Sequence, residues 1–90
     1  MMKTIIFDSK SFKWDDNYET NKCIIEGTVQ LLYDLFDARG YMYLNYIYEC
    51  FGVAWDPHEV NECFIKGSNS FALSCERMKD NVFKINIYSV

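Results

Sequence analysis

A short aromatic segment bracketed by two glycines separates a helical pattern from a β-rich pattern and so determines the layout of the chain. From Gly40 to Gly52 it reads Gly-Tyr-Met-Tyr-Leu-Asn-Tyr-Ile-Tyr-Glu-Cys-Phe-Gly. Glycine readily takes the left-handed conformation that closes a helix just past its last turn. We therefore expect Gly40 to end the helix before the segment and Gly52 to end the helix within it. Tyr41 and Met42 predict a short extended piece between the two helices.

The later part of this segment has the pattern of a short amphipathic helix that begins near Leu44. Its apolar residues recur at helical spacing and would form the stripe that packs on the core. These residues are Leu44, Ile47, Tyr48 and Phe51. The arrangement leaves Asn45, Tyr46 and Glu49 facing outward.

The clearest helix of the chain is predicted from about Thr20 to Arg39. Its apolar stripe consists of Ile24, Thr28, Leu31, Leu35 and Ala38. The opposite side is polar and carries Glu26, Gln30, Asp34 and Asp37. Gly27 destabilises such a helix by about 1 kcal/mol relative to alanine, and close packing against another backbone is the usual reason for a glycine there. The alternative is a helix that begins only after Gly27.

Both ends of the chain predict β-strands. Residues 3–7 alternate weakly and are rich in β-branched side chains, which favours a first strand. Residues 71–76 and 82–90 alternate apolar with polar side chains, and Lys79-Asp80-Asn81 between them has the chemistry of a hairpin turn. We therefore expect a C-terminal antiparallel hairpin. Residues 12–14 predict either a brief extended piece or a loop that caps the core.

Residues 56–64 have the signals of a second short helix. Asp56 would cap it, Pro57 would take the first position, where its missing N–H costs nothing, and Glu59 would complete a capping box. The helix would reach about Phe64. Its inward residues would be Val60, Cys63 and Phe64.

Together these elements predict a single α+β domain over residues 1–90, with an N-terminal strand, a long helix, two short helices and a C-terminal antiparallel β-hairpin. Apart from the first strand, this is also the order of a winged-helix domain, whose third helix and wing read DNA. The third helix here carries Asp56, Glu59 and Glu62, whereas base recognition uses Arg, Lys, Asn or Gln. A winged-helix-like DNA-binding regulator is therefore kept as the alternative function.

The charge of the chain argues against nucleic acid as its partner. The net charge is −4, and the nine Lys and Arg residues form no run. Binding to phosphates depends on clustered Lys and Arg side chains. An acidic surface serves either solubility or complementarity to a basic protein partner, and composition does not separate these two.

The sequence predicts neither a membrane span nor a signal peptide. Its apolar runs are only a few residues long, which is too short to cross a bilayer. The N-terminal residues lack the apolar core and the small-residue cleavage site of a secretory signal. We therefore expect a cytoplasmic protein that does not bind membranes.

The cysteines and the single histidine do not form a recognisable site. Cys23, Cys50, Cys63 and Cys75 have no C-x-x-C spacing and are expected to be reduced thiols that pack as small hydrophobes. Their spacing from His58 is not that of a structural zinc site, and the i,i+5 offset points Cys63 away from His58 on a helix. We expect no catalytic residue, metal or cofactor, and a small enzyme or metal protein that uses these residues is the second rival.

Two stretches of the sequence resemble a known family. They are Phe7-Asp8-Ser9-Lys10 and residues 40–53, which read GYMYLNYIYECFGV. They are similar to small proteins carried by phages and mobile elements of Gram-positive gut bacteria, in which the central motif is G-Y-V-x-L-N-D-x-Y-E-x-L-G-L. Tyr46 stands where that family tends to have Asp, and the Gly-Trp pair expected near residues 64–67 is missing. The resemblance implies a mobile-element origin and assigns no catalytic residue.

The tyrosines of the central segment are the candidates for a binding surface. One short helix and its lead-in cannot bury all of them, and tyrosine offers a large rigid area with a polar tip. We predict a protein-binding face that consists of Tyr43, Tyr46 and Glu49 with Glu59 and Glu62 of the next helix. The alternative is that two of the tyrosines pack over the hairpin and the others are merely exposed.

These observations lead to a functional hypothesis. The chain is expected to be a non-enzymatic accessory protein of a phage or mobile element that binds a host or mobile-element protein in the host cell cytoplasm. An inhibitor of a host defence factor, such as a CRISPR-type nuclease, is the sharper form of this hypothesis. A homodimer formed through the tyrosine face or through an edge of the hairpin would compete with any partner.

Overall fold

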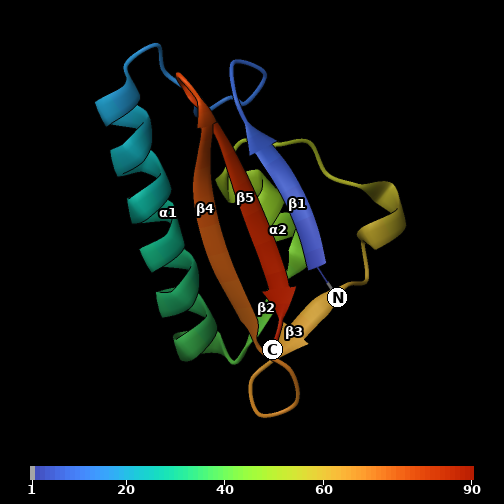
Figure 1. Cartoon of the computed structure of the whole chain (residues 1–90). Helices are drawn as coiled ribbons and strands as arrows, with labels where there is room; N and C mark the ends of the chain where they lie inside the picture. Colours follow the sequence, from blue (N-terminus) through green and yellow to red (C-terminus); the bar gives the residue numbers. More distant parts are fainter. Residues whose placement is uncertain (1) are drawn as a thin grey trace.

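The computed structural model describes residues 2–90, which form an α+β fold (Figure 1). In chain order the elements are β1 (Met2–Phe7), α1 (Tyr18–Arg39), β2 (Tyr41–Tyr43), α2 (Leu44–Cys50), the 3-10 turn η1 (Pro57–Glu59), β3 (Cys63–Ile65), β4 (Phe71–Lys79) and β5 (Val82–Ser89). The N-terminal strand, the long helix, the shorter helix and the C-terminal antiparallel strands are as predicted. None of the helices in the described residues is both long and apolar enough to span a membrane.

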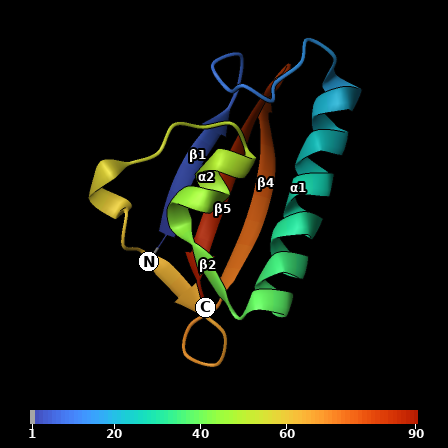
Figure 2. The same ribbon diagram turned by 180° about the vertical axis from the view of Figure 1, so that it is seen from behind.

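The main sheet has the order β1–β5–β4, and both pairs of neighbours are antiparallel. The predicted C-terminal hairpin supplies two of its strands, and the N-terminal strand pairs with the last strand of the chain. On the central strand, Ile85 pairs with Ile5 on one side and with Cys75 on the other. Helix α2 lies behind this sheet in Figure 1 and in front of it in Figure 2, and both views show α1 alongside β4, while no element of residues 2–90 covers the opposite face of the sheet.

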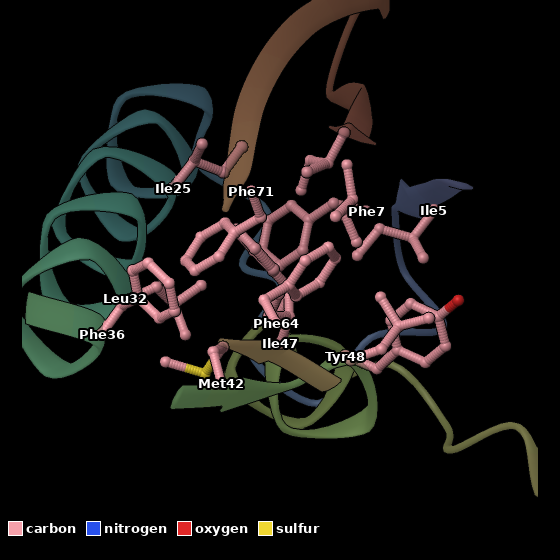
Figure 3. Close-up of a cluster of buried hydrophobic side chains, with 14 of the residues drawn as sticks. Ile5, Phe7, Ile25, Leu32, Phe36, Met42, Ile47, Tyr48, Phe64 and Phe71 are labelled. Carbon is pink, nitrogen blue, oxygen red and sulfur yellow. The ribbon is translucent and has the colours of Figure 1, made fainter. Parts of the chain in front are cut away.

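The hydrophobic core fills the space between the sheet and the two helices (Figure 3). Phe71 lies where three elements meet, because its ring centroid is 5.1 Å from that of Phe36 on α1 and 5.3 Å from that of Phe64 on β3. The core includes Ile5 and Phe7 of β1, which face the helices. The terminal strand therefore contributes to the same core as the helices.

The long helix begins earlier than predicted and is not interrupted. Asn17 caps it, because its side-chain oxygen accepts a hydrogen bond from the Thr20 N–H at 3.0 Å, and helical order starts at Tyr18. The alternative start after Gly27 is wrong. A Cβ added to Gly27 would meet no atom of residues 2–90 within 4 Å beyond its chain neighbours and its own helix backbone, so close packing does not explain this glycine. Gly40 ends the helix with φ of +85°, as predicted.

The buried side of α1 is shifted by one position along the chain from the predicted stripe. The buried positions are Asn21, Ile25, Leu32 and Phe36, whereas Leu31 is 47% exposed. Both sets have helical spacing, so the choice depends on which side chains fit the sheet. The polar member of the stripe, Asn21, is buried because its amide bonds the Asp15 backbone N–H and C=O at 2.8 and 2.7 Å.

Residues 12–14 belong to a loop and not to a strand. The Trp14 indole N–H donates to the Asn81 carbonyl oxygen at 2.8 Å, and the Trp14 side chain packs against the core. Asn81 also accepts a hydrogen bond from Asn21 at 2.8 Å. These bonds hold the loop before α1 against the turn of the C-terminal hairpin.

The predicted helix over residues 56–64 is wrong in its length. Asp56 does cap a turn, since its carboxylate accepts from the His58 N–H at 2.9 Å, and Pro57 takes the first position. Only Pro57–Glu59 forms this single 3-10 turn, and Val60 is exposed rather than inward. The capping box is absent because the Asp56 N–H bonds to the side chain of Asn45 instead.

A two-stranded sheet takes the place of the second half of that helix. β3 pairs antiparallel with β2, so that Met42 lies opposite Phe64 and both are buried in the core. Burial of these two large side chains favours extended backbone over a continued helix. The described chain therefore lacks the third helix that a winged-helix domain would insert into the major groove.

Candidate functional site

Helix α2 starts directly after β2 and presents two different sides. Its predicted apolar stripe is confirmed, because Leu44, Ile47, Tyr48 and Phe51 are all buried. Glu49 is exposed and Tyr46 is half-buried, as expected for the outward side. The outward side of this short helix is therefore the part that can contact another molecule.

Asn45 was predicted to face outward, and that prediction is wrong. The residue is buried, and its side-chain amide bonds both backbone groups of Asp56 at 3.0 Å, donating to the C=O and accepting from the N–H. The side-chain amide of Asn45 thus makes the same two hydrogen bonds to the Asp56 backbone that a residue of a neighbouring strand would make. This pairing holds the segment that carries Trp55 against α2.

Glu59 was predicted to belong to the binding face, but it is buried on another side of the fold. Its carboxylate accepts a hydrogen bond from the Tyr48 hydroxyl at 2.7 Å and forms an ion pair with the Lys3 ammonium at 2.6 Å. The contact joins η1 to α2 and β1. Burial and the Glu59 carboxylate raise the pKa of Tyr48 well above its usual range. Glu59 is therefore a structural residue.

Glu62 is exposed, yet its charge acts on the same cluster. The hydrogen bond and the charge of Glu59 raise the pKa of Lys3, and the carboxylates of Asp56 and Glu62 add to this effect. The backbone of Glu62 accepts a hydrogen bond from the Leu44 N–H at 3.0 Å, which ties β3 to the start of α2. Of the two acidic residues predicted from this segment, only Glu62 is thus available to a partner.

The remaining predicted residues lie together around one depression of about 400 Å³. It is lined by Tyr43, Asn45, Tyr46, Glu49, Trp55, Val60 and Asn61, and we call it the aromatic depression. Trp55 is 56% exposed and Tyr43 is 49% exposed. The structure therefore brings Tyr43, Tyr46 and Glu49 into one site and adds Trp55 and Val60, which the sequence prediction missed.

The two missed residues carried different signals. Trp55 directly precedes a helix-capping Asp and a Pro, a position outside any regular element, where an apolar residue of this size is uncommon unless it packs or binds. Val60 was assigned to the buried side of a helix that does not form. Only the actual path of the chain from η1 into β3 brings Val60 to the depression.

Further apolar side chains extend this surface across the small sheet. Tyr41 pairs with Ile65 and Tyr43 with Cys63 on the side that faces away from the core, and Tyr41 and Ile65 are both exposed. The Tyr41 and Tyr43 rings meet edge to face at 5.8 Å. Clustered exposed apolar side chains of this kind commonly mark an interaction surface.

Tyr46 separates the aromatic depression from a second groove between α1 and α2. That groove has a volume of about 560 Å³ and is lined by Lys13, Cys23, Ile24, Gly27, Thr28, Leu31, Tyr46, Glu49 and Cys50. Burial raises the pKa of the Cys50 thiol. The Arg39 guanidinium lies 5.4 Å from the centroid of the Tyr46 ring. Tyr46 and Glu49 therefore border both hollows.

The histidine and the cysteines, which the sequence analysis did not assign to a site, do not form a cluster in the fold. His58 is exposed in η1, and all four cysteines are free thiols. Within residues 2–90, no group of three or more His, Cys, Asp and Glu side chains is arranged to hold a metal ion. Comparison with known proteins found no matching family model, no matching curated protein and no matching solved structure.

Proposed function

We propose that this chain is a non-enzymatic protein-binding module that contacts its partner through the aromatic depression and the exposed apolar residues beside it. The observation that carries the proposal is the gathering of Tyr43, Tyr46, Trp55 and Val60 with Glu49 around one hollow. Aromatic side chains are enriched at the centres of protein interfaces because they contribute large contact areas at low entropic cost.

The chemistry of the partner follows from charge. The chain has a net charge of −4, and Glu49 and Glu62 are exposed near the apolar surface. Opposite charges accelerate association and favour the correct partner. The partner is therefore a protein with a basic surface around an apolar or aromatic contact.

The biological setting of the proposal rests on the resemblance of residues 40–53 to the phage and mobile-element family. We assign the chain to such an element and place its action in the cytoplasm of the bacterial host. Its role would be that of an accessory protein that inhibits a host defence factor, for example a CRISPR-type nuclease. A basic nucleic-acid channel is a surface that a small acidic protein complements.

A comparative pull-down from host lysate tests the proposal. The natural chain is compared with Trp55→Ser, which alters the depression, and with Tyr88→Ser, which alters an exposed aromatic residue on the open face of the main sheet. Circular dichroism first verifies that both variants fold. We expect one host protein to be retained by the natural chain and Tyr88→Ser and to be lost with Trp55→Ser. Retention by all three forms would place the contact elsewhere and contradict the proposal.

A further inference from the structure

The walls of the aromatic depression have the composition of a site for an organic cation. Two phenol rings and one indole, from Tyr43, Tyr46 and Trp55, surround the space together with the carboxylate of Glu49. Ring faces carry a negative quadrupole that attracts ammonium and guanidinium groups. We propose that the depression receives an arginine side chain of the partner, an inference that rests on the proposed protein-binding function and names the group it recognises.

Arginine fits this combination of groups better than other side chains do. Its planar guanidinium stacks on aromatic faces and pairs with a carboxylate at the same time. An apolar side chain would use the rings but leave Glu49 without a partner. A hard metal ion requires several oxygen ligands, whereas Glu49 is the only carboxylate that the described residues place in the lining of the depression.

The molecule already places a guanidinium against one of these rings. Arg39 lies 5.4 Å from the centroid of Tyr46, which shows that this ring binds a guanidinium, and the arginine of the partner would therefore stack on Tyr43 and Trp55. Among residues 2–90, no Lys or Arg side chain lines the aromatic depression itself. The site therefore combines the Glu49 carboxylate with three aromatic rings, while Lys13 lies with Glu49 in the lining of the neighbouring groove.

The backbone around the depression is fixed before any ligand arrives. The Asn45 amide holds Asp56, the neighbour of Trp55, with two hydrogen bonds of 3.0 Å. The Leu44 N–H holds Glu62, two residues after Val60, at 3.0 Å. A site assembled in advance loses less conformational entropy on binding. Val60 supplies an apolar surface for the methylene stem of the arginine.

The test titrates a model peptide into the full chain. The probe is acetyl-Gly-Arg-Gly-amide, and the control is the same peptide with citrulline, which is close in shape and neutral. The readout is the indole N–H signal of each tryptophan in a proton–nitrogen NMR spectrum. Trp55 lines the site, whereas the Trp14 indole donates to Asn81 and serves as an internal reference.

We expect the arginine peptide to shift the Trp55 signal saturably and to leave the Trp14 signal in place. The citrulline peptide should bind at least about 5-fold more weakly, since it lacks the charge that the rings and Glu49 attract. Glu49→Gln should weaken arginine binding about 2- to 5-fold. Glu76→Gln, on the outer face of the main sheet, should leave it unchanged.

Equal binding of the two peptides, or a Glu49→Gln variant with unchanged affinity, would overturn the arginine inference. Its failure is separable from that of the proposed function. If Trp55→Ser loses a host protein while the arginine peptide does not bind, the protein-binding face stands and the arginine site is rejected. If the peptide binds at Trp55 but all forms retain the same host proteins, the cation site stands and the proposed function is rejected.

Discussion

Single residues decide which part of the surface is available to a partner. Asn45 of α2 was predicted to face outward and Glu59 of η1 to belong to the binding face, yet both are buried and join separate segments. A buried polar group is tolerated only when it is paired. Their partners lie 11 residues away in the chain. Periodicity describes one element at a time and therefore cannot reveal such pairings.

The buried contact between Tyr48 and Glu59 makes stability dependent on pH. The folded state holds the pKa of Tyr48 above its unfolded value of about 10. The contribution of Tyr48 is therefore fully present below pH 10 and is lost as pH rises further, because the unfolded chain releases the proton first. We expect the free energy of unfolding to fall above pH 10, by up to about 1.4 kcal/mol per pH unit from this residue.

Tyr48→Phe provides the control for this pH dependence. At pH 8 the variant should be less stable by about 1–3 kcal/mol, because a buried carboxylate oxygen loses its donor. Urea unfolding between pH 8 and pH 11 should show the two stabilities converging. A difference that stays constant over this range would mean that Tyr48 does not titrate as described.

At the scale of elements, the two bracketing glycines end their helices for different reasons. Both have positive φ, +85° at Gly40 and +71° at Gly52. An added Cβ meets no atom within 4 Å at Gly40, but at Gly52 it would lie 2.7 Å from Ser11 Oγ and 2.8 Å from Lys13 N. Gly52 therefore also permits the close approach of the loop that precedes α1.

The effect of an alanine substitution on stability should depend on the backbone conformation and the free space at each of three glycines. Gly27→Ala should stabilise the protein by about 0.5–1 kcal/mol, since the site is helical and open. Gly40→Ala should cost about 1–2 kcal/mol for the left-handed backbone alone. Gly52→Ala should destabilise the protein by about 1–3 kcal/mol more than Gly40→Ala does, because the loop before α1 must also shift. Denaturant unfolding of the three variants measures the order, and equal losses at Gly40 and Gly52 would contradict it.

The sequence predicted the elements well where local rules apply. The C-terminal ends of α1 and α2 follow from Gly40 and Gly52, and the C-terminal hairpin follows from its alternation and turn, whereas the start of α1 at Tyr18, capped by Asn17, lies before the predicted start near Thr20. The helix predicted over residues 56–64 failed because pairing of Met42 with Phe64 overrides the local capping signal. The sequence predicted that Tyr43, Tyr46 and Glu49 share a surface, and they line one depression, whereas Trp55 and Val60 reach the same depression only through that long-range pairing.

At the scale of the whole molecule, residues 2–90 cover the main sheet on one face and leave the other face open (Figure 1). Its open face carries exposed apolar side chains, among them Met2, Ile6 and Tyr88. A polar row crosses the middle of this face. The Thr4 hydroxyl donates to the Asn86 side-chain oxygen at 2.9 Å, and the Asn86 amide donates to the Ser74 hydroxyl at 3.3 Å.

This polar row divides the apolar surface into separate parts. Met2 and Tyr88 pair on one side of the row, whereas Ile6 lies on the other side of it, paired with Lys84. A continuous apolar patch on a flat sheet favours association between molecules, and interspersed polar groups prevent it. We therefore expect the row to limit association of molecules through the open face.

Replacing the whole row tests this role. The triple variant Thr4→Val, Ser74→Val and Asn86→Val removes all the polar groups together and so leaves none of them unpaired. We expect it to fold and to self-associate in a concentration-dependent way during sedimentation, more strongly than the natural chain does. A matched variant, Tyr43→Ser, alters the aromatic depression and should not change the association. If the triple variant sediments as the natural chain does at every concentration, the polar row does not govern the open face.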